Sequence, residues 1–162
     1  MTGRDTSQEQ LKSSVIACLR TEMPGIVGDQ PVMLAYLYGS IADGSASSAS
    51  DVDIALVFEP GCPLSPYERM ERELHIAAEI EDRCSLQEAD VRSIDNAPLT
   101  VQGKILEDGV LLYSRNEDFR VQYEVYTRKL YFDFVPVEEM MRQAFFERVK
   151  QEGLTGGETR QG

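Results

Sequence analysis

The chain has 162 residues, with 16 Lys and Arg against 28 Asp and Glu, which gives a formal net charge of −12. A chain of this length fits one domain, and its hydrophobic fraction of 42% suffices for an ordinary core. Phosphate contacts need a basic track, so a protein this acidic is not expected to bind nucleic acid directly. Metal ions can neutralise a carboxylate cluster locally, so the charge does not exclude a nucleotide.

The three cysteines show no C-x-x-C pair; they are Cys18, Cys62 and Cys84. An odd count without framework spacing indicates a reducing compartment and speaks against a structural zinc site. Residues 1–10 contain no apolar signal segment, and no apolar run approaches the roughly 20 residues of a membrane helix. We therefore expect a soluble, cytoplasmic protein with no membrane contact.

The first predicted helix begins at a capping box, Thr6 with Glu9 three residues on. Its apolar stripe ends before Pro24 and contains Leu11, Val15, Cys18 and Leu19. Residues 32–38 form a continuous apolar run that reads as a buried strand and stops at Gly39. The Gly-, Ala- and Ser-rich segment 41–50 predicts a loop or a short helix.

A second strand is predicted at 52–58, where apolar residues alternate. Ser65 and Glu68 form a capping box around Pro66, a strong helix start. The expected buried face of this helix consists of Tyr67, Met70, Leu74, Ala77 and Ala78. A third strand is expected at 88–94.

Next come a short helix over 98–106, which Gly109 stops, and a fourth strand over 110–113. Aromatic and apolar residues then recur at helical spacing, at Phe119, Tyr123, Tyr126, Leu130 and Phe134. Pro136 is expected to interrupt that helix before another over 137–150.

These elements predict an α/β (α+β) domain, with a small mixed sheet flanked by helices and further helices at the C-terminus. We expect a single domain over 1–150, with a core at 32–113 and C-terminal helices at 116–150. The Gly- and Thr-rich segment 151–162 is expected to be disordered.

The most informative pattern is Gly39-Ser40, ten further residues, and then Asp51-Val52-Asp53. Alternate residues of a strand share a face, so Asp51 and Asp53 are expected to point the same way, about 6.6 Å apart along the backbone. Two convergent carboxylates on a rigid strand suit a hard cation, Mg²⁺ above all. A glycine turn after a buried strand lets the backbone approach a phosphate, and the Ser40 hydroxyl adds a donor. A phosphate cradle beside a carboxylate metal site is what phosphoryl or nucleotidyl transfer requires.

Such a site needs a third carboxylate. Asp90 is the best candidate because it lies on the next predicted strand, with Ala89 and Val91 on the opposite face. Asp95 and Glu88 are the alternatives.

The Gly-Ser turn, the spacer, Asp-x-Asp and the later strand Asp resemble the minimal nucleotidyltransferase (MNT) branch of the polymerase-beta-like superfamily. The resemblance covers roughly residues 32–135 and includes Ala97-Pro98-Leu99, the segment 106–113 and the segment 131–134. This longer pattern is similar to the MntA-type antitoxins of HEPN/MNT toxin–antitoxin pairs.

The resemblance implies a polymerase-beta-like fold, ATP as donor, two Mg²⁺ ions and transfer of AMP to a tyrosine of a partner HEPN ribonuclease toxin. It assigns Gly39 and Ser40 to the ATP phosphates, and Asp51, Asp53 and Asp90 to the metals. Two alternatives stay open: a non-catalytic antitoxin with a relic nucleotide site, and a nucleotidyltransferase acting on a small molecule.

Other polar residues have ordinary explanations. His75 is the only histidine, which leaves little material for Ser–His–Asp or Cys–His catalysis. Arg69 and His75 resemble the Arg-x-His signature of HEPN ribonucleases only by coincidence. Lys104 and Arg128 are candidates for contact with a triphosphate, but solvated surface positions are the preferred interpretation of both.

Overall fold

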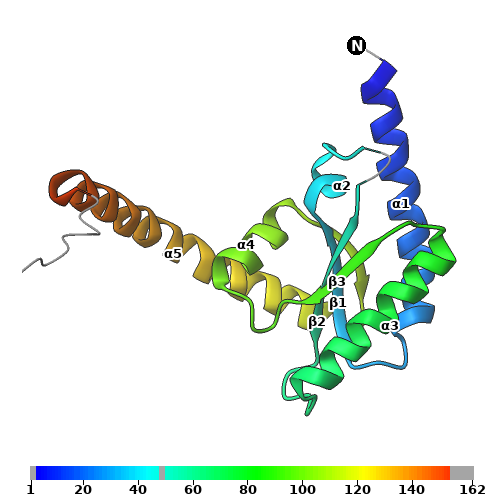
Figure 1. Ribbon diagram of the computed structural model, residues 1–162. Coiled ribbons are helices and arrows are strands. Elements are labelled where there is room, and N and C mark those ends of the chain that lie inside the picture. The colour runs from blue at the N-terminus through cyan, green and yellow to red at the C-terminus, as the bar shows by residue number, and fades with distance from the viewer. Residues whose placement is uncertain (1–2, 48–49, 154–162) are drawn as a thin grey trace, which may run out of the picture.

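The computed structural model describes residues 3–47 and 50–153, which form a four-stranded mixed sheet (Figure 1). Its strands are β1 (Val32–Tyr38), β2 (Val52–Phe58), β3 (Ala89–Ser93) and β4 (Val110–Ser114), in the order β3-β2-β1-β4. β1 pairs antiparallel with β2 and β4, and β2 pairs parallel with β3. The predicted strands are confirmed: β1 and β2 have the predicted bounds, and the ends of β3 and β4 differ by at most one residue.

Helices cover both faces of the sheet; they are α1 (Gly3–Val27), α2 (Gly39–Asp43), α3 (Pro66–Cys84), α4 (Leu99–Asp108) and α5 (Glu117–Glu152). On one face, Leu37 and Ile54 belong to a core shared with Leu19 of α1 and with Ile76 and Ile80 of α3. In β1 and β2, the side chains that alternate with these core residues point to the other face of the sheet. There, residues of the sheet pack with α4 and the start of α5, in a second core of Leu34, Tyr36, Ala55, Val57, Ile94, Ile105 and Leu106. The period-2 alternation of β1 and β2 thus produces a three-layer arrangement, and the predicted fold class is confirmed.

The predicted limits of the first helix are wrong at both ends. α1 already includes Thr6, so this residue does not cap it, and the helix continues through Pro24 to Val27. Proline removes one backbone hydrogen bond from a helix interior. Met23 and Val27 are completely buried on either side of it, and this packing holds the last turn in place.

In α3 the predicted start is confirmed but the predicted face is wrong. The Ser65 side chain accepts the Glu68 N–H at 3.2 Å, and the Glu68 carboxylate accepts the Ser65 N–H at 2.8 Å. The buried positions are Glu73, Ile76, Ala77 and Ile80, whereas Tyr67, Met70 and Leu74 are exposed and only Ala77 was correctly predicted. The sequence pattern did not reveal this buried face because it includes a charged residue, Glu73. The Glu73 carboxylate accepts the Ser93 N–H of β3 at 2.8 Å.

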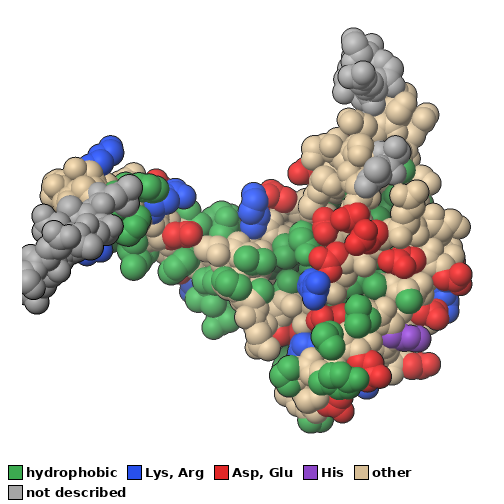
Figure 2. Space-filling model, in the orientation of Figure 1, with side chains coloured by type: hydrophobic (Ala, Val, Ile, Leu, Met, Phe, Trp, Pro, Cys, Tyr) green, Lys and Arg blue, Asp and Glu red, His purple; other side chains and the backbone are tan. Residues whose placement is uncertain are grey.

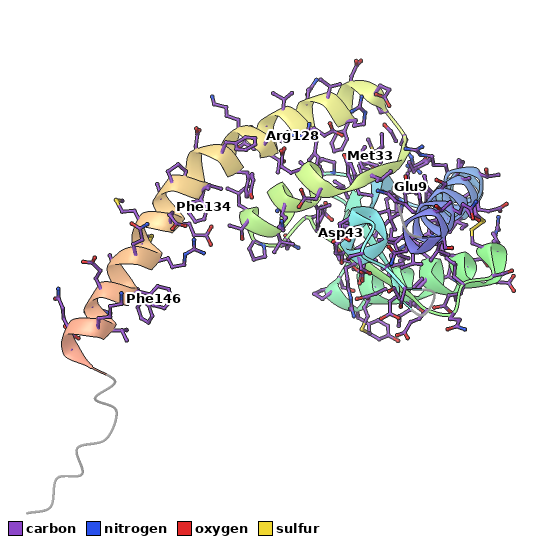
Figure 3. All side chains as sticks on the ribbon, turned by 90° about the horizontal axis from the view of Figure 1, so that it is seen from above. Glu9, Met33, Asp43, Arg128, Phe134 and Phe146 are labelled. Atoms are coloured by element: carbon purple, nitrogen blue, oxygen red, sulfur yellow. A yellow bond between two sulfur atoms is a disulfide. The ribbon has the colours of Figure 1, made fainter. Side chains whose placement is uncertain are left out.

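The C-terminal region forms one helix, where two were expected. α5 runs through Pro136 without a break, and its axis curves near Phe134 (Figure 3). It also includes Gln151 and Glu152, which belong to the segment predicted to be disordered. Residues 154–162 of that segment lie outside the described residues.

Two of the three cysteines form a disulfide. Cys18 of α1 is bonded to Cys84 of α3, with their Cα atoms 5.9 Å apart, and Cys62 is free. This disulfide departs from the expectation drawn from the number and spacing of the cysteines, because partners separated by 66 residues meet only through the packing of α1 on α3. Within the described ranges, no helix combines the length and apolar character needed to span a membrane.

Candidate active site

The turn at the end of β1 is shaped by Gly39. This residue has a φ of +72°, in the left-handed region that favours glycine, and it begins α2 directly after the strand. A Cβ atom at this position would collide with Oδ2 of Asp53. The backbone of the turn and the Asp53 carboxylate are therefore in direct contact, and only a glycine fits between them.

Three polar side chains form a row across the sheet. Tyr38 at the end of β1 is the register partner of Asp53 in β2, and Asp53 is in turn the partner of Asp90 in β3. Residues directly opposite in neighbouring strands lie on the same face, so the three side chains share one edge of the site. Asp51 is exposed and precedes the first residue of β2. Figure 2 shows acidic side chains gathered on the surface below α2.

Burial and repulsion shift the pKa values of Asp53 and Tyr38. The pKa of Asp53 is raised by burial first, and then by the negative charges of Asp90 and Asp51. Burial likewise raises the pKa of the Tyr38 phenol, and Asp53 and Asp90 raise it further. A site of this kind favours the binding of positive charge, because a cation removes the repulsion among the carboxylates.

Asp90 has a competing partner. Its Oδ1 accepts a hydrogen bond from Arg92 Nε at 2.8 Å, in an ion pair at the exposed edge of β3. In the part of the chain that the structure describes, no three His, Cys, Asp or Glu side chains are arranged as a ready metal site. The three aspartates nevertheless supply the oxygen ligands and the shared negative charge that suit Mg²⁺. The residues fit this ion in chemistry, and Asp90 would have to turn from Arg92 to contribute.

Neither of the two alternatives to Asp90 is the register partner of Asp53. Asp95 accepts hydrogen bonds from Arg69 Nη1 at 2.7 Å and from the Phe58 N–H at 3.1 Å, at the far end of β2. Glu88 is exposed, and its carbonyl accepts the Val52 N–H at 3.0 Å. Of the three candidates, Asp90 is the one in register with Asp53.

A cavity of about 450 Å³ opens beside the glycine turn. This volume lies in the range of small-molecule sites. β1 and α2 line one wall and α4 the other, with Tyr38, Gly39, Asp43, Thr100, Val101, Lys104, Ile105 and Asp108. Tyr38 and Thr100 were not among the predicted site residues, and nothing in their local patterns distinguishes them from core or helix residues.

Lys104 and Arg128 have different surroundings. Lys104 is exposed and pairs with Asp108 at 2.8 Å, yet it lines the cavity that Gly39 also lines. Arg128 is held by Glu107 at 3.0 Å and by the Leu106 carbonyl at 2.7 Å, and so connects α5 to α4. Ser40 is half-buried, and its carbonyl accepts the N–H groups of Ser45 and Ala46 at 3.0 Å, which closes the turn after α2.

Known structures share the fold. The chain is similar to one in a crystal structure described as a toxin–antitoxin with AMP-PNP, with a TM-score of 0.58 and 19% identity over 81% of this chain and 98% of that one. It is also similar to one in a tri-AMPylated HEPN toxin in complex with MNT antitoxin from Shewanella oneidensis, with a TM-score of 0.55, 17% identity and coverage of 83% and 98%. No curated protein matched the chain.

Sequence identities this low do not assign the chain to a family, but a match to a family model does. The model described as "Polymerase beta, Nucleotidyltransferase" matches residues 26–118, more than half of the chain. This segment contains the Gly39 turn, all three aspartates and every strand of the sheet. The chain therefore belongs to the polymerase beta nucleotidyltransferase family.

Proposed function

We propose that this protein is an antitoxin that transfers AMP from ATP to a tyrosine of a partner HEPN ribonuclease toxin and so neutralises it. The observation that carries the proposal is the contact of the Gly39 turn with Asp53, in register with Asp90 and beside a cavity of about 450 Å³. The similar chains come from toxin–antitoxin structures, one with AMP-PNP and one with an AMPylated toxin. We place this chain and its HEPN partner in the cytoplasm, where both ATP and RNA are present.

In this proposal Gly39 and Ser40 seat the triphosphate. The first backbone N–H groups of a helix have no hydrogen-bond partner within it. The start of α2, where Gly39 is exposed, therefore offers backbone N–H donors. Asp51, Asp53 and Asp90 would hold two Mg²⁺ ions, which supply charge neutralisation for the triphosphate.

The proposed reaction is a displacement at the α-phosphorus. The tyrosine oxygen of the acceptor forms a bond to this phosphorus, and the bond to the bridging oxygen of pyrophosphate breaks. Asp90 accepts the phenolic proton, and pyrophosphate leaves with the bonding electron pair. Lys104 lies on the cavity wall, where its ammonium group can balance the charge of the phosphates.

AMP transfer is tested by incubating this chain with its purified candidate HEPN partner, ATP and Mg²⁺. We expect the toxin to gain the mass of one or more AMP groups on a tyrosine and to stay inactive after this chain is removed. Each AMP adds a charge and a bulky base, which repel and obstruct the RNA backbone. Intact-mass spectrometry of the re-isolated toxin measures the transfer. An unmodified mass with full recovery of ribonuclease activity contradicts the proposal.

Nucleotide binding is expected to require the metal. ATP with Mg²⁺ should raise the melting temperature, because a ligand that binds only the folded state stabilises by about 2.7 kcal/mol at a hundred times its Kd. ATP with EDTA should produce little change, because the triphosphate then meets three uncompensated aspartates. Differential scanning fluorimetry measures both. Equal shifts with and without metal would indicate a pocket away from the aspartates.

One observation favours the second candidate, a non-catalytic antitoxin that neutralises its toxin by binding. Asp90 is paired with Arg92, and the described residues contain no preformed metal cluster. In that case inhibition needs no nucleotide, scales with antitoxin concentration and reverses on separation. The mass measurement above distinguishes the two functions.

A further inference from the structure

The distal half of α5, residues 132–152, extends away from the body of the molecule (Figures 1 and 3). We call this segment the arm. Tyr131 is the last half-buried residue of α5 before the arm, and its ring lies against Gly103 of α4. Every residue from 132 to 148 is exposed. No other element of the described chain covers the arm.

The exposed surface of the arm is unusually apolar. Eight large apolar side chains are 38–64% exposed: Phe132, Phe134, Val135, Val137, Met140, Met141, Phe145 and Phe146. Together they present on the order of 700 Å² of apolar surface, if an aromatic side chain has about 150–250 Å². A typical monomer has a largest patch of roughly 300–600 Å², and a stable interface buries about 800 Å² per partner. The arm therefore has the area of an interface.

Six of the eight apolar side chains occupy two faces of the helix, while Val137 lies about 60° from Phe134, beside the first face, and Met140 lies on the remaining side. At about 100° per residue, Phe134, Met141 and Phe145 fall within about 40° of one another, and this face continues the one by which Tyr123 packs on the body. Phe132, Val135 and Phe146 form a second face roughly 130° away. Two arms paired along one seam would cover the first face only. A partner that receives the helix in a groove covers both.

Charge also distinguishes between the two possible binding partners of the arm, a second copy of this chain and a different protein. A second copy of this chain would bring together two proteins of net charge −12, and such self-repulsion keeps proteins apart. A protein that binds RNA carries a basic surface and is attracted instead. The acceptor in the proposed function is a ribonuclease, whose RNA-binding surface is expected to be basic and so to complement this chain.

The position of the arm connects it to the candidate site. Gly103 of α4 contacts the root of the arm at Tyr131, and Thr100 and Lys104 of the same helix line the cavity beside Gly39. Figure 2 shows apolar side chains continuing from the arm onto the body on the face that also shows the acidic side chains. A protein bound to the arm is thus held next to the cavity, which raises the local concentration of its acceptor group.

We propose that the arm is the docking surface for the protein acceptor of AMP, which receives both apolar faces of the helix in a groove with a basic rim. The identity of this acceptor as the HEPN toxin rests on the proposed function. The arm then acts in substrate capture, and the aspartates act in the transfer.

The test compares the full-length chain with the double variant Met141→Glu/Phe145→Glu. Both side chains are exposed, 64% and 55%, and glutamate is a good helix former, so the fold is expected to persist. The control is the double variant Tyr67→Glu/Leu74→Glu on α3, where two exposed side chains, 68% and 64%, receive the same two negative charges. Size-exclusion chromatography with light scattering and titration calorimetry measure binding to the purified HEPN protein, and mass spectrometry measures AMP transfer.

We expect the double variant to bind the HEPN protein roughly a hundred-fold more weakly, because central apolar anchors dominate interface energies. The KM for the toxin should rise accordingly, while the ATP–Mg²⁺ melting shift stays unchanged and the control behaves as the wild type. Unchanged binding by the double variant overturns the proposal. So does a wild-type homodimer that the double variant dissociates, which would assign the arm to a second copy, and so does a wild type that fails to bind the HEPN protein. Arm-dependent binding without any AMP transfer supports the docking surface and refutes the proposed reaction.

Discussion

Asp53→Asn is expected to reduce AMP transfer by roughly a thousand-fold or more, because charge stabilisation at a metal site contributes several kcal/mol and each tenfold in rate corresponds to about 1.4 kcal/mol. Asp53 contacts the Gly39 turn, and its pKa responds to both Asp51 and Asp90. An amide keeps the shape of the side chain but loses the charge that a cation requires. The transfer rate, followed with α-labelled ATP, measures the loss.

The same variant is expected to fold as stably as the wild type, or more so, at pH 7. The pKa of Asp53 is raised in the folded state above 3.8, so folding is favoured by its protonated form and loses stability as the pH rises through the folded pKa. Asparagine removes this penalty, and the difference in melting temperature should disappear at pH values below 3.8. Asp82→Asn, an exposed change on α3, is the control for rate and stability. Transfer within a few-fold of wild type, or unfolding at pH 7, contradicts the role given to Asp53.

Local patterns predicted the frame of this molecule well. The apolar runs at 32–38 and 52–58 are β1 and β2, and the box of Ser65 and Glu68 starts α3, because burial of a short run and capping depend on neighbours in sequence. The continuous apolar run at 32–38 indicates a strand that is buried on both faces. The Gly-Ser turn and the aspartates could likewise be identified from spacing.

Features that depend on distant contacts were not predictable in this way. The register that pairs Asp53 with Asp90, and Tyr38 with Asp53, arises from sheet assembly, and no spacing rule encodes it. The buried face of α3 was missed because Glu73 is satisfied by a backbone N–H from β3. α5 continues through Pro136, because one missing hydrogen bond does not end a helix whose other bonds persist. Each error lies where tertiary packing outweighs a local signal.

Gly39→Ala is expected to abolish most of the AMP transfer. The same substitution at a second glycine, Gly61, separates the backbone penalty from the collision with Asp53. An L-residue at a φ of +72° costs about 1–2 kcal/mol of folding stability. Gly61 has a nearly identical φ of +77°, and a Cβ there meets nothing within 4 Å. Gly61→Ala therefore reproduces the backbone penalty alone. Only at Gly39 does the added methyl group also collide with the Asp53 carboxylate.

The collision involves the end of a side chain that can rotate away, so the two variants should lose similar stability in urea denaturation. Rotation, however, moves the Asp53 carboxylate out of the row it shares with Asp90, and the new methyl group stands where a phosphate must approach the backbone. We expect Gly39→Ala to lose both the ATP–Mg²⁺ melting shift and at least about a hundred-fold in transfer rate, the loss typical of a misplaced catalytic group. Gly61→Ala should keep both. Transfer retained by Gly39→Ala, or lost equally by Gly61→Ala, would show that the close approach of turn and carboxylate has no part in the reaction.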